Sequence, residues 1–117
     1  MNKILIIVSL LASSIFLGAC SQQTPENVIV IEFKNGTYTP SEITIKQYQK
    51  VTFINQSDTD IWPASNIHPT HQIYPQFDPQ KPVKPNQSWS FTFDRVGTLR
   101  FHDHLSPQIT GIITTEQ

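Results

Sequence analysis

The sequence predicts an all-β fold, an antiparallel sandwich or barrel, from two observations. Short apolar segments with alternating polarity recur along residues 28–117, and turn residues separate them. The same region contains no amphipathic segment of ten or more residues with helical spacing. Once the N-terminal leader described below is set aside, the remaining chain is long enough for one domain with its own apolar core.

The expected strands can be taken in chain order. Asn35-Gly36 is a turn signal that ends the first of them. The clearest alternation is in residues 89–93, where three aromatic side chains share one face and two hydroxyl side chains share the other, so we expect the aromatic face in the core. The full set of expected strands is 28–33, 43–45, 51–53, 89–93, 99–104 and 109–115.

One long segment interrupts this pattern. Residues 62–86 contain six of the nine prolines of the chain and show little periodicity. A compact domain seldom carries so long a loop unless the loop has a function or packs its own side chains. A passive rigid insert is the alternative interpretation.

The N-terminus has the three parts of a secretory leader. Lys3 gives a positive start, an apolar stretch follows, and Leu-Gly-Ala precedes Cys20. This string resembles a bacterial lipobox. The resemblance implies a signal peptide over residues 1–19, lipidation of Cys20 (palmitate or a similar acyl chain) and a lipidated tether over residues 20–27. The expected location is the bacterial cell envelope on its periplasmic face, with the outer membrane favoured by Ser21 if the cell is Gram-negative.

Composition excludes several classes of protein. The charges nearly balance, 8 Lys+Arg against 9 Asp+Glu, which argues against a nucleic-acid partner. A single cysteine permits neither an internal disulfide nor a CxxC motif. No Gly-x-Ser-x-Gly motif is present, and we do not expect an enzyme. Asp58, Asp60 and Asp78 lack the spacing of an EF-hand and are interpreted as loop and turn residues.

The four histidines fall in two close pairs. His68 and His71 lie in the long loop, whereas His102 and His104 end an expected strand. On a strand, residues two apart project to the same face, so His102 and His104 can bind one ion. Four imidazoles would form an all-nitrogen site, for which the divalent affinity order favours copper as Cu(II) over zinc. Two alternatives remain open: solvated rim residues, or polar groups bonded to the backbone.

Three segments resemble the cupredoxin family, which includes plastocyanin, azurin and the small EfeO-type domains associated with iron uptake. Residues 51–55 (VTFIN) resemble the strand before the first copper histidine of the family. Residues 97–102 (GTLRFH) resemble the approach to its ligand loop, and residues 110–113 (TGII) resemble its closing strand. The resemblance implies a Greek-key β-sandwich over residues 28–117.

The resemblance does not extend to the copper ligands of the family. Laid without gaps, the cysteine, second histidine, methionine and first histidine of the family fall on Asp103, Ser106, Ile109 and Ile61 or Trp62. A blue-copper site needs a thiolate, so blue-copper electron transfer is not expected. Asp103 could serve as a hard metal ligand or orient a ligating imidazole.

The alternation also indicates which way the strand histidines face. Leu99 and Phe101 are expected in the core, which places His102 and His104 on the opposite face, away from the usual copper pocket. The long loop could then bring His68 and His71 to them.

These observations predict a non-enzymatic, envelope-anchored protein. Its four-histidine site would bind copper and buffer it or deliver it to a protein partner, with the membrane contacted through the lipid. Two alternatives stay open: a metal-free adhesion or assembly module that uses the Pro-rich loop, and a redox protein with histidine-ligated copper.

Overall fold

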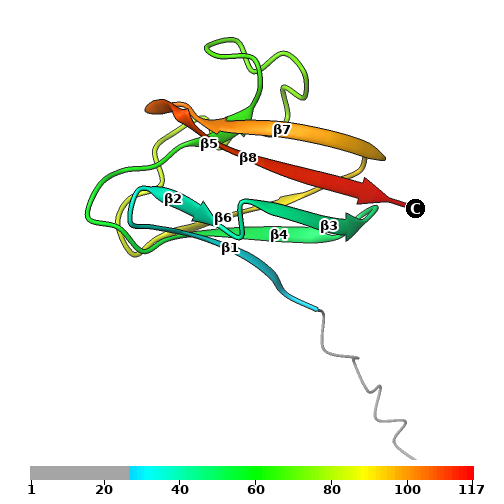
Figure 1. Cartoon of the computed structure of the whole chain (residues 1–117), viewed down its shortest axis with the longest axis horizontal. Helices are drawn as coiled ribbons and strands as arrows, with labels where there is room; N and C mark the ends of the chain where they lie inside the picture. Colours follow the sequence, from blue (N-terminus) through cyan, green and yellow to red (C-terminus); the bar gives the residue numbers. More distant parts are fainter. Residues whose placement is uncertain (1–26) are drawn as a thin grey trace, which may run out of the picture.

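The computed structural model describes residues 27–117, which form a sandwich of two four-stranded sheets (Figure 1). Within these residues there are strands and turns but no helix. The expected all-β fold is therefore confirmed. The strands are β1 Ile29–Lys34, β2 Thr37–Thr39, β3 Glu42–Lys46, β4 Lys50–Asn55, β5 Pro63–Ser65, β6 Ser88–Thr92, β7 Gly97–Asp103 and β8 Ser106–Glu116.

Both sheets are mixed rather than purely antiparallel. The first has the order β2-β1-β4-β6 and the second the order β3-β8-β7-β5. The pairs β1/β4 and β3/β8 are parallel, and the other neighbouring pairs are antiparallel. Alternation in a sequence predicts a strand and its buried face but not the direction of its neighbour, which explains why the parallel pairs were not expected.

The core lies between the sheets and is rich in aromatic rings. Strand alternation turns Phe53 of β4 and Phe101 of β7 inward, and both are fully buried. Their rings meet edge to face with centroids 5.7 Å apart, a favoured aromatic geometry. The aromatic face predicted for residues 89–93 also packs in this core, with Phe93 buried and Trp89 and Phe91 partly buried.

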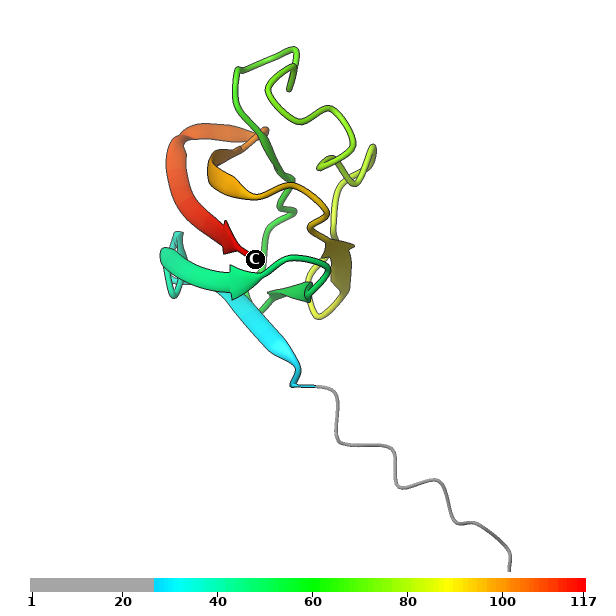
Figure 2. The same ribbon diagram turned by 90° about the vertical axis from the view of Figure 1, so that its right-hand side faces the viewer.

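The long loop between β5 and β6 packs its own apolar side chains into the domain. Tyr74, Phe77 and Val83 are all buried in the core. The Phe77 ring contacts the Phe53 and Phe101 rings, at centroid distances of 5.6 and 5.9 Å. Figure 2 shows the loop rising over β5 and β7 on the outer side of the second sheet. The loop is thus held in place by its own buried side chains, one of the two explanations expected for so long a loop.

The leader, Cys20 and most of the tether precede the described residues. The predictions for the signal peptide, the lipid and residues 20–26 therefore lie outside them. From residue 27 onward, no helix has the length and apolar character needed to span a membrane.

Candidate metal centre

β7 and the turn that follows it place two histidines on the outer face of the second sheet. Leu99 and Phe101 point into the core, so His102 points the other way, opposite Ala64 of β5. The β7/β8 register shifts between His102 and Asp103, and the following turn carries His104. The backbone N–H of His104 donates to the Trp62 carbonyl oxygen at 2.7 Å. His102 thus lies on the face away from the core, as the alternation predicted. His104 reaches the same cluster from the turn, because the strand ends at Asp103, one residue earlier than expected.

The long loop brings the other two histidines onto this face. The four imidazoles, from His68, His71, His102 and His104, each offer one ligand nitrogen, and these nitrogens all lie within 4.8 Å of one another. Two pairs are in direct contact: His68 Nδ1 lies 3.3 Å from His102 Nε2, and His71 Nε2 lies 2.9 Å from His104 Nδ1. We call this group the histidine cluster. The expected convergence of the two sequence pairs is seen in the geometry.

The loop backbone around His71 is tightly held. Its N–H donates to the Ile67 carbonyl oxygen at 2.6 Å, which closes one turn over residues 67–71. His71 has a positive φ of 52°, a region that non-glycine residues occupy at a free-energy cost of about 1 kcal/mol or more. The side-chain hydrogen bonds described next hold it there.

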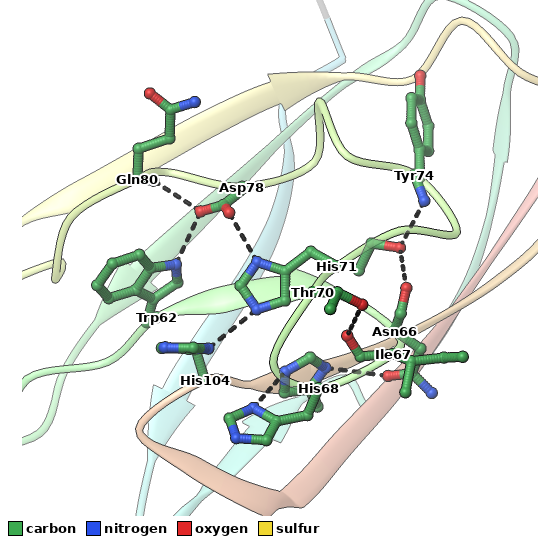
Figure 3. A network of polar contacts seen from close by, with 12 residues as sticks. Trp62, Asn66, Ile67, His68, Thr70, His71, Tyr74, Asp78, Gln80 and His104 are labelled. Carbon is green, nitrogen blue, oxygen red and sulfur yellow. Dashed lines mark hydrogen bonds and ion pairs between the residues drawn. The ribbon is translucent and has the colours of Figure 1, made fainter.

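Asp78 fixes the His71 ring from the loop side (Figure 3). His71 Nδ1 donates to Asp78 Oδ2 at 2.7 Å, while Trp62 Nε1 and the Gln80 backbone N–H donate to Asp78 Oδ1 at 2.8 and 2.7 Å. Burial raises the pKa of Asp78, but these hydrogen bonds, with that from His71 first, outweigh burial and hold the pKa below its usual value. The carboxylate is charged and accepts a hydrogen bond from His71 Nδ1–H, which leaves His71 Nε2 facing the cluster.

Asn66 does the same for His102. The Asn66 side-chain oxygen Oδ1 lies 3.1 Å from His102 Nδ1, and an amide oxygen can only accept, so His102 Nδ1 carries the proton. The lone pair of His102 Nε2 is then directed to the cluster. Asn66 is itself held by backbone hydrogen bonds to Arg100 and Ile73.

The electrostatics of the cluster favour the neutral form of the His102 and His104 rings. Burial, and then the neighbouring His71 and His68, lower the pKa of His102 to about 4. The same causes lower the pKa of His104. Both rings are therefore neutral at pH 7, the form that binds metals.

Asp103 lies on the core side of β7 and takes no part in the hydrogen bonds of the cluster. Its buried carboxylate accepts four other hydrogen bonds: one from Tyr38 Oη at 2.6 Å and three from the backbone N–H groups of Trp62, Leu105 and Ser106 at 2.8–3.1 Å. Within residues 27–117, no hydrogen bond joins it to a histidine ring. Asp103 acts instead on the backbone, because it holds the Trp62 N–H while the Trp62 carbonyl accepts from His104.

Three of the positions that the family resemblance equates with its ligands border a different cavity. Asp103, Ser106 and Ile109 line an open cavity of about 560 Å³ at the end of the sandwich. The histidine cluster lies instead on the outer face of the second sheet, under the long loop. The two places are separated by the thickness of β7, because His102 and Asp103 project to opposite faces.

Sequence reasoning missed Asp78 and Asn66. Asp78 was interpreted as a turn residue, and its bond to the Gln80 N–H is a turn contact. Its second oxygen holds His71, however, so Asp78 belongs to the cluster surroundings. A carboxylate within the same Pro-rich loop as a histidine pair was the one available signal, since ligating imidazoles usually donate their outer N–H to such a group.

Comparison with known proteins supports the fold. An amicyanin variant in its reduced Cu(I) form at pH 4 matches with 21% identity and a TM-score of 0.67, over 80% of this chain and 87% of that one. A second reduced amicyanin variant matches with 21% identity and a TM-score of 0.67 over 81% and 87%. An oxidised variant gives the same identity and TM-score over 80% and 87%. No curated protein sequence matches.

The sequence itself matches a family model. The model is described as a cupredoxin-like domain, and it matches residues 5–115. This span covers almost the whole chain, with β1 to β7 complete and β8 without its last residue. The chain belongs to the cupredoxin-like family.

Proposed function

We propose that this protein binds copper as cargo at the histidine cluster and buffers it or delivers it to a partner. The observation that carries the proposal is the convergence of four ligand nitrogens within 4.8 Å. The ligands would be His68 Nδ1, His71 Nε2, His102 Nε2 and His104 Nδ1, the atoms that face one another in the cluster.

The cluster fits a single metal ion in size. Two nitrogens bound to one ion at about 2.0–2.1 Å from it can be at most about 4.2 Å apart. The four nitrogens, now up to 4.8 Å apart, therefore need side-chain movements of under about 1 Å to bind one ion together. The hydrogen bonds of Asp78 and Asn66 already direct two of the four nitrogens, His71 Nε2 and His102 Nε2, into the cluster.

The donor set favours copper in its divalent state. Imidazole suits Cu(II), Zn(II) and Ni(II), and the affinity order among them places Cu(II) first. The structural neighbours include copper proteins, since the amicyanin structures include Cu(I) forms. The sole cysteine of this sequence is Cys20, far from the cluster in sequence, so the colour and redox behaviour of a copper–thiolate bond are not part of the proposal. Storing or transferring copper requires neither the colour nor the redox behaviour of such a bond.

The proposed location is the bacterial envelope. It rests on the lipobox resemblance around Cys20, with residues 1–19 removed and residues 20–27 acting as the tether. A lipid-anchored copper carrier would meet copper where the ion enters the envelope, and its protein partner would be a copper acceptor in the same compartment. Radiolabelled palmitate in expressing bacteria tests the anchor, with Cys20→Ser as the control that must lose the label.

A metal titration tests the proposal. The full-length chain carrying Cys20→Ser is kept in detergent and titrated with Cu(II), Zn(II) and Ni(II), because the substitution removes the only competing thiol. We expect one Cu(II) per chain, bound more tightly than Zn(II) or Ni(II), with no intense thiolate-to-copper absorption band. The double variant His102→Ala/His104→Ala should lose this site. Unaltered copper binding in the double variant, or no stoichiometric copper in the parent, would refute the assignment and favour a metal-free module.

A further inference from the structure

The four histidines are not equally held. His71 and His102 are buried, with 5% and 2% of their surfaces exposed, whereas His104 is half-buried and His68 is exposed. An acceptor molecule approaching from solvent therefore reaches His68 before it reaches the buried pair.

The two buried rings, His71 and His102, are also the ones held by hydrogen bonds from outside the cluster. Asp78 holds His71 Nδ1, and Asn66 holds His102 Nδ1, so each buried ring has a fixed orientation and its Nε2 is free to bind a metal. Trp62 Nε1 and the Gln80 N–H in turn hold Asp78, which keeps the support rigid (Figure 3). His71 and His102 are thus prepared as ligands before any ion arrives.

His104 has weaker support and His68 has the least. The His104 ring packs against Trp62 with centroids 4.8 Å apart, and the His104 backbone is bonded to the Trp62 carbonyl. Within residues 27–117, the hydrogen-bond and ring contacts of the His68 imidazole are with other members of the cluster, namely His102 and His104. Among residues 27–117, no hydrogen bond from outside the cluster holds the His68 ring.

Hydrogen bonds within the cluster join the less buried rings to the buried pair. Because the neutral His102 ring carries its proton on Nδ1, its Nε2 accepts, and His68 Nδ1–H is the donor in their 3.3 Å contact. His104 Nδ1 lies 2.9 Å from His71 Nε2 in the equivalent contact, so each of the two less buried rings is joined to one buried ring. Exposure separates these two, because His68 is exposed and His104 is half-buried.

We propose that His68 is the exchanging ligand, through which copper passes to an acceptor, while His71 and His102 retain the ion until transfer is complete. This deepens the proposed function and rests on it. In the exchange, the bond between copper and His68 Nδ1 breaks and a bond forms to an incoming neutral nitrogen donor, an imidazole or amine of the acceptor. The oxidation state of copper does not change, because one neutral nitrogen donor replaces another.

Transfer kinetics test the proposal. The Cys20→Ser chain loaded with Cu(II) is mixed with excess free L-histidine as the acceptor, and loss of the protein-bound copper absorption is followed by stopped flow. His68→Ala should keep one Cu(II) with an affinity reduced by about tenfold and should transfer it at least about tenfold faster than the parent. His102→Ala, the control from the buried pair, should lose more than about 100-fold in affinity, since even the loss of a supporting contact to a ligand costs 10–100-fold.

The outcomes separate the two proposals. If the parent chain binds no stoichiometric copper, both the proposed function and this inference are refuted. Copper binding in the parent with His68→Ala as damaged as His102→Ala, or with transfer at the parent rate, would overturn the exchange role alone. Circular dichroism checks the fold of each variant. His68→Asn, which keeps a polar side chain at this exposed position, repeats the measurement if the alanine variant is misfolded.

Discussion

The hydrogen bond that His71 donates to Asp78 offers a sharp test of how the cluster is built. Asp78→Asn preserves the size of the side chain but replaces one oxygen with an amide NH₂ group. If the NH₂ faces His71, it donates to Nδ1 and moves the ring proton to Nε2, the atom that faces the cluster. If the amide is turned over, the NH₂ instead faces two donors, Trp62 Nε1 and the Gln80 N–H. Either orientation damages the site.

The expected loss follows from what such contacts contribute elsewhere. Removing the group that orients a ligating imidazole lowers metal affinity by about 10–100-fold, equivalent to about 1.4–2.7 kcal/mol. The contact here is 2.7 Å long and half-buried, and it holds a ligand with a positive φ, so we expect the upper half of this range. Competition titration of Cu(II) against a chelator of known affinity, in the Cys20→Ser chain, measures it.

Asp58→Asn is the matched control. It makes the same change of charge at an exposed loop aspartate outside the cluster. Its copper affinity should equal that of the parent within about twofold, since surface substitutions away from special contacts change free energies by about 0.5 kcal/mol or less. Equal affinity for Asp78→Asn and Asp58→Asn would refute the claim that Asp78 prepares His71 for metal binding.

Three further predictions concern stability. Cu(II) at a free concentration 100 times Kd should stabilise the fold by about 2.7 kcal/mol and raise Tm by roughly 10–20 °C in calorimetry, and no shift would count against a folded-state site. Burial and then the Asp103 charge raise the pKa of Tyr38 in the folded protein. In the unfolded chain the Tyr38 hydroxyl ionises near pH 10, so above about pH 10 this group should lower the free energy of unfolding by about 1.4 kcal/mol per pH unit. Tyr38→Phe should remove that component in urea unfolding at pH 9–11, and parallel curves for the two proteins would contradict it. Gly111→Ala would drive a Cβ into the Phe101 ring and should cost about 1–3 kcal/mol in the same assay, so an unchanged midpoint would show that the strand backbone can move aside.

Much of the fold could be predicted because alternation reports burial directly. Phe91 and Phe93 in one segment and Leu99 and Phe101 in another pack in the core as their spacing indicates. β5 was not expected, because its three residues show no alternation and begin with proline. It forms through pairing with β7, where Ala64 lies opposite His102, and this long-range contact leaves no local signal in the sequence.

The candidate metal site, too, could be predicted only in part from the sequence. Convergence of two histidine pairs could be predicted, because their spacing matches one strand face and one turn. The supporting residues could not, because Asn66 reaches His102 across 36 positions of sequence, and the Asp78 contact to His71 depends on how a loop without periodicity folds. The path of that loop is fixed by Phe77, whose burial in the core was likewise not visible as a pattern.

The central claim is that one copper ion sits among the four imidazoles rather than at the end of the sandwich, where Asp103 lies. A crystal structure of the copper-loaded chain, with anomalous scattering recorded at the copper edge, tests it directly. The account predicts one anomalous peak between the loop pair, His68 and His71, and the strand pair, His102 and His104. A peak in the cavity beside Asp103 and Ser106, or no peak in a crystal shown to contain copper-bound protein, would contradict it.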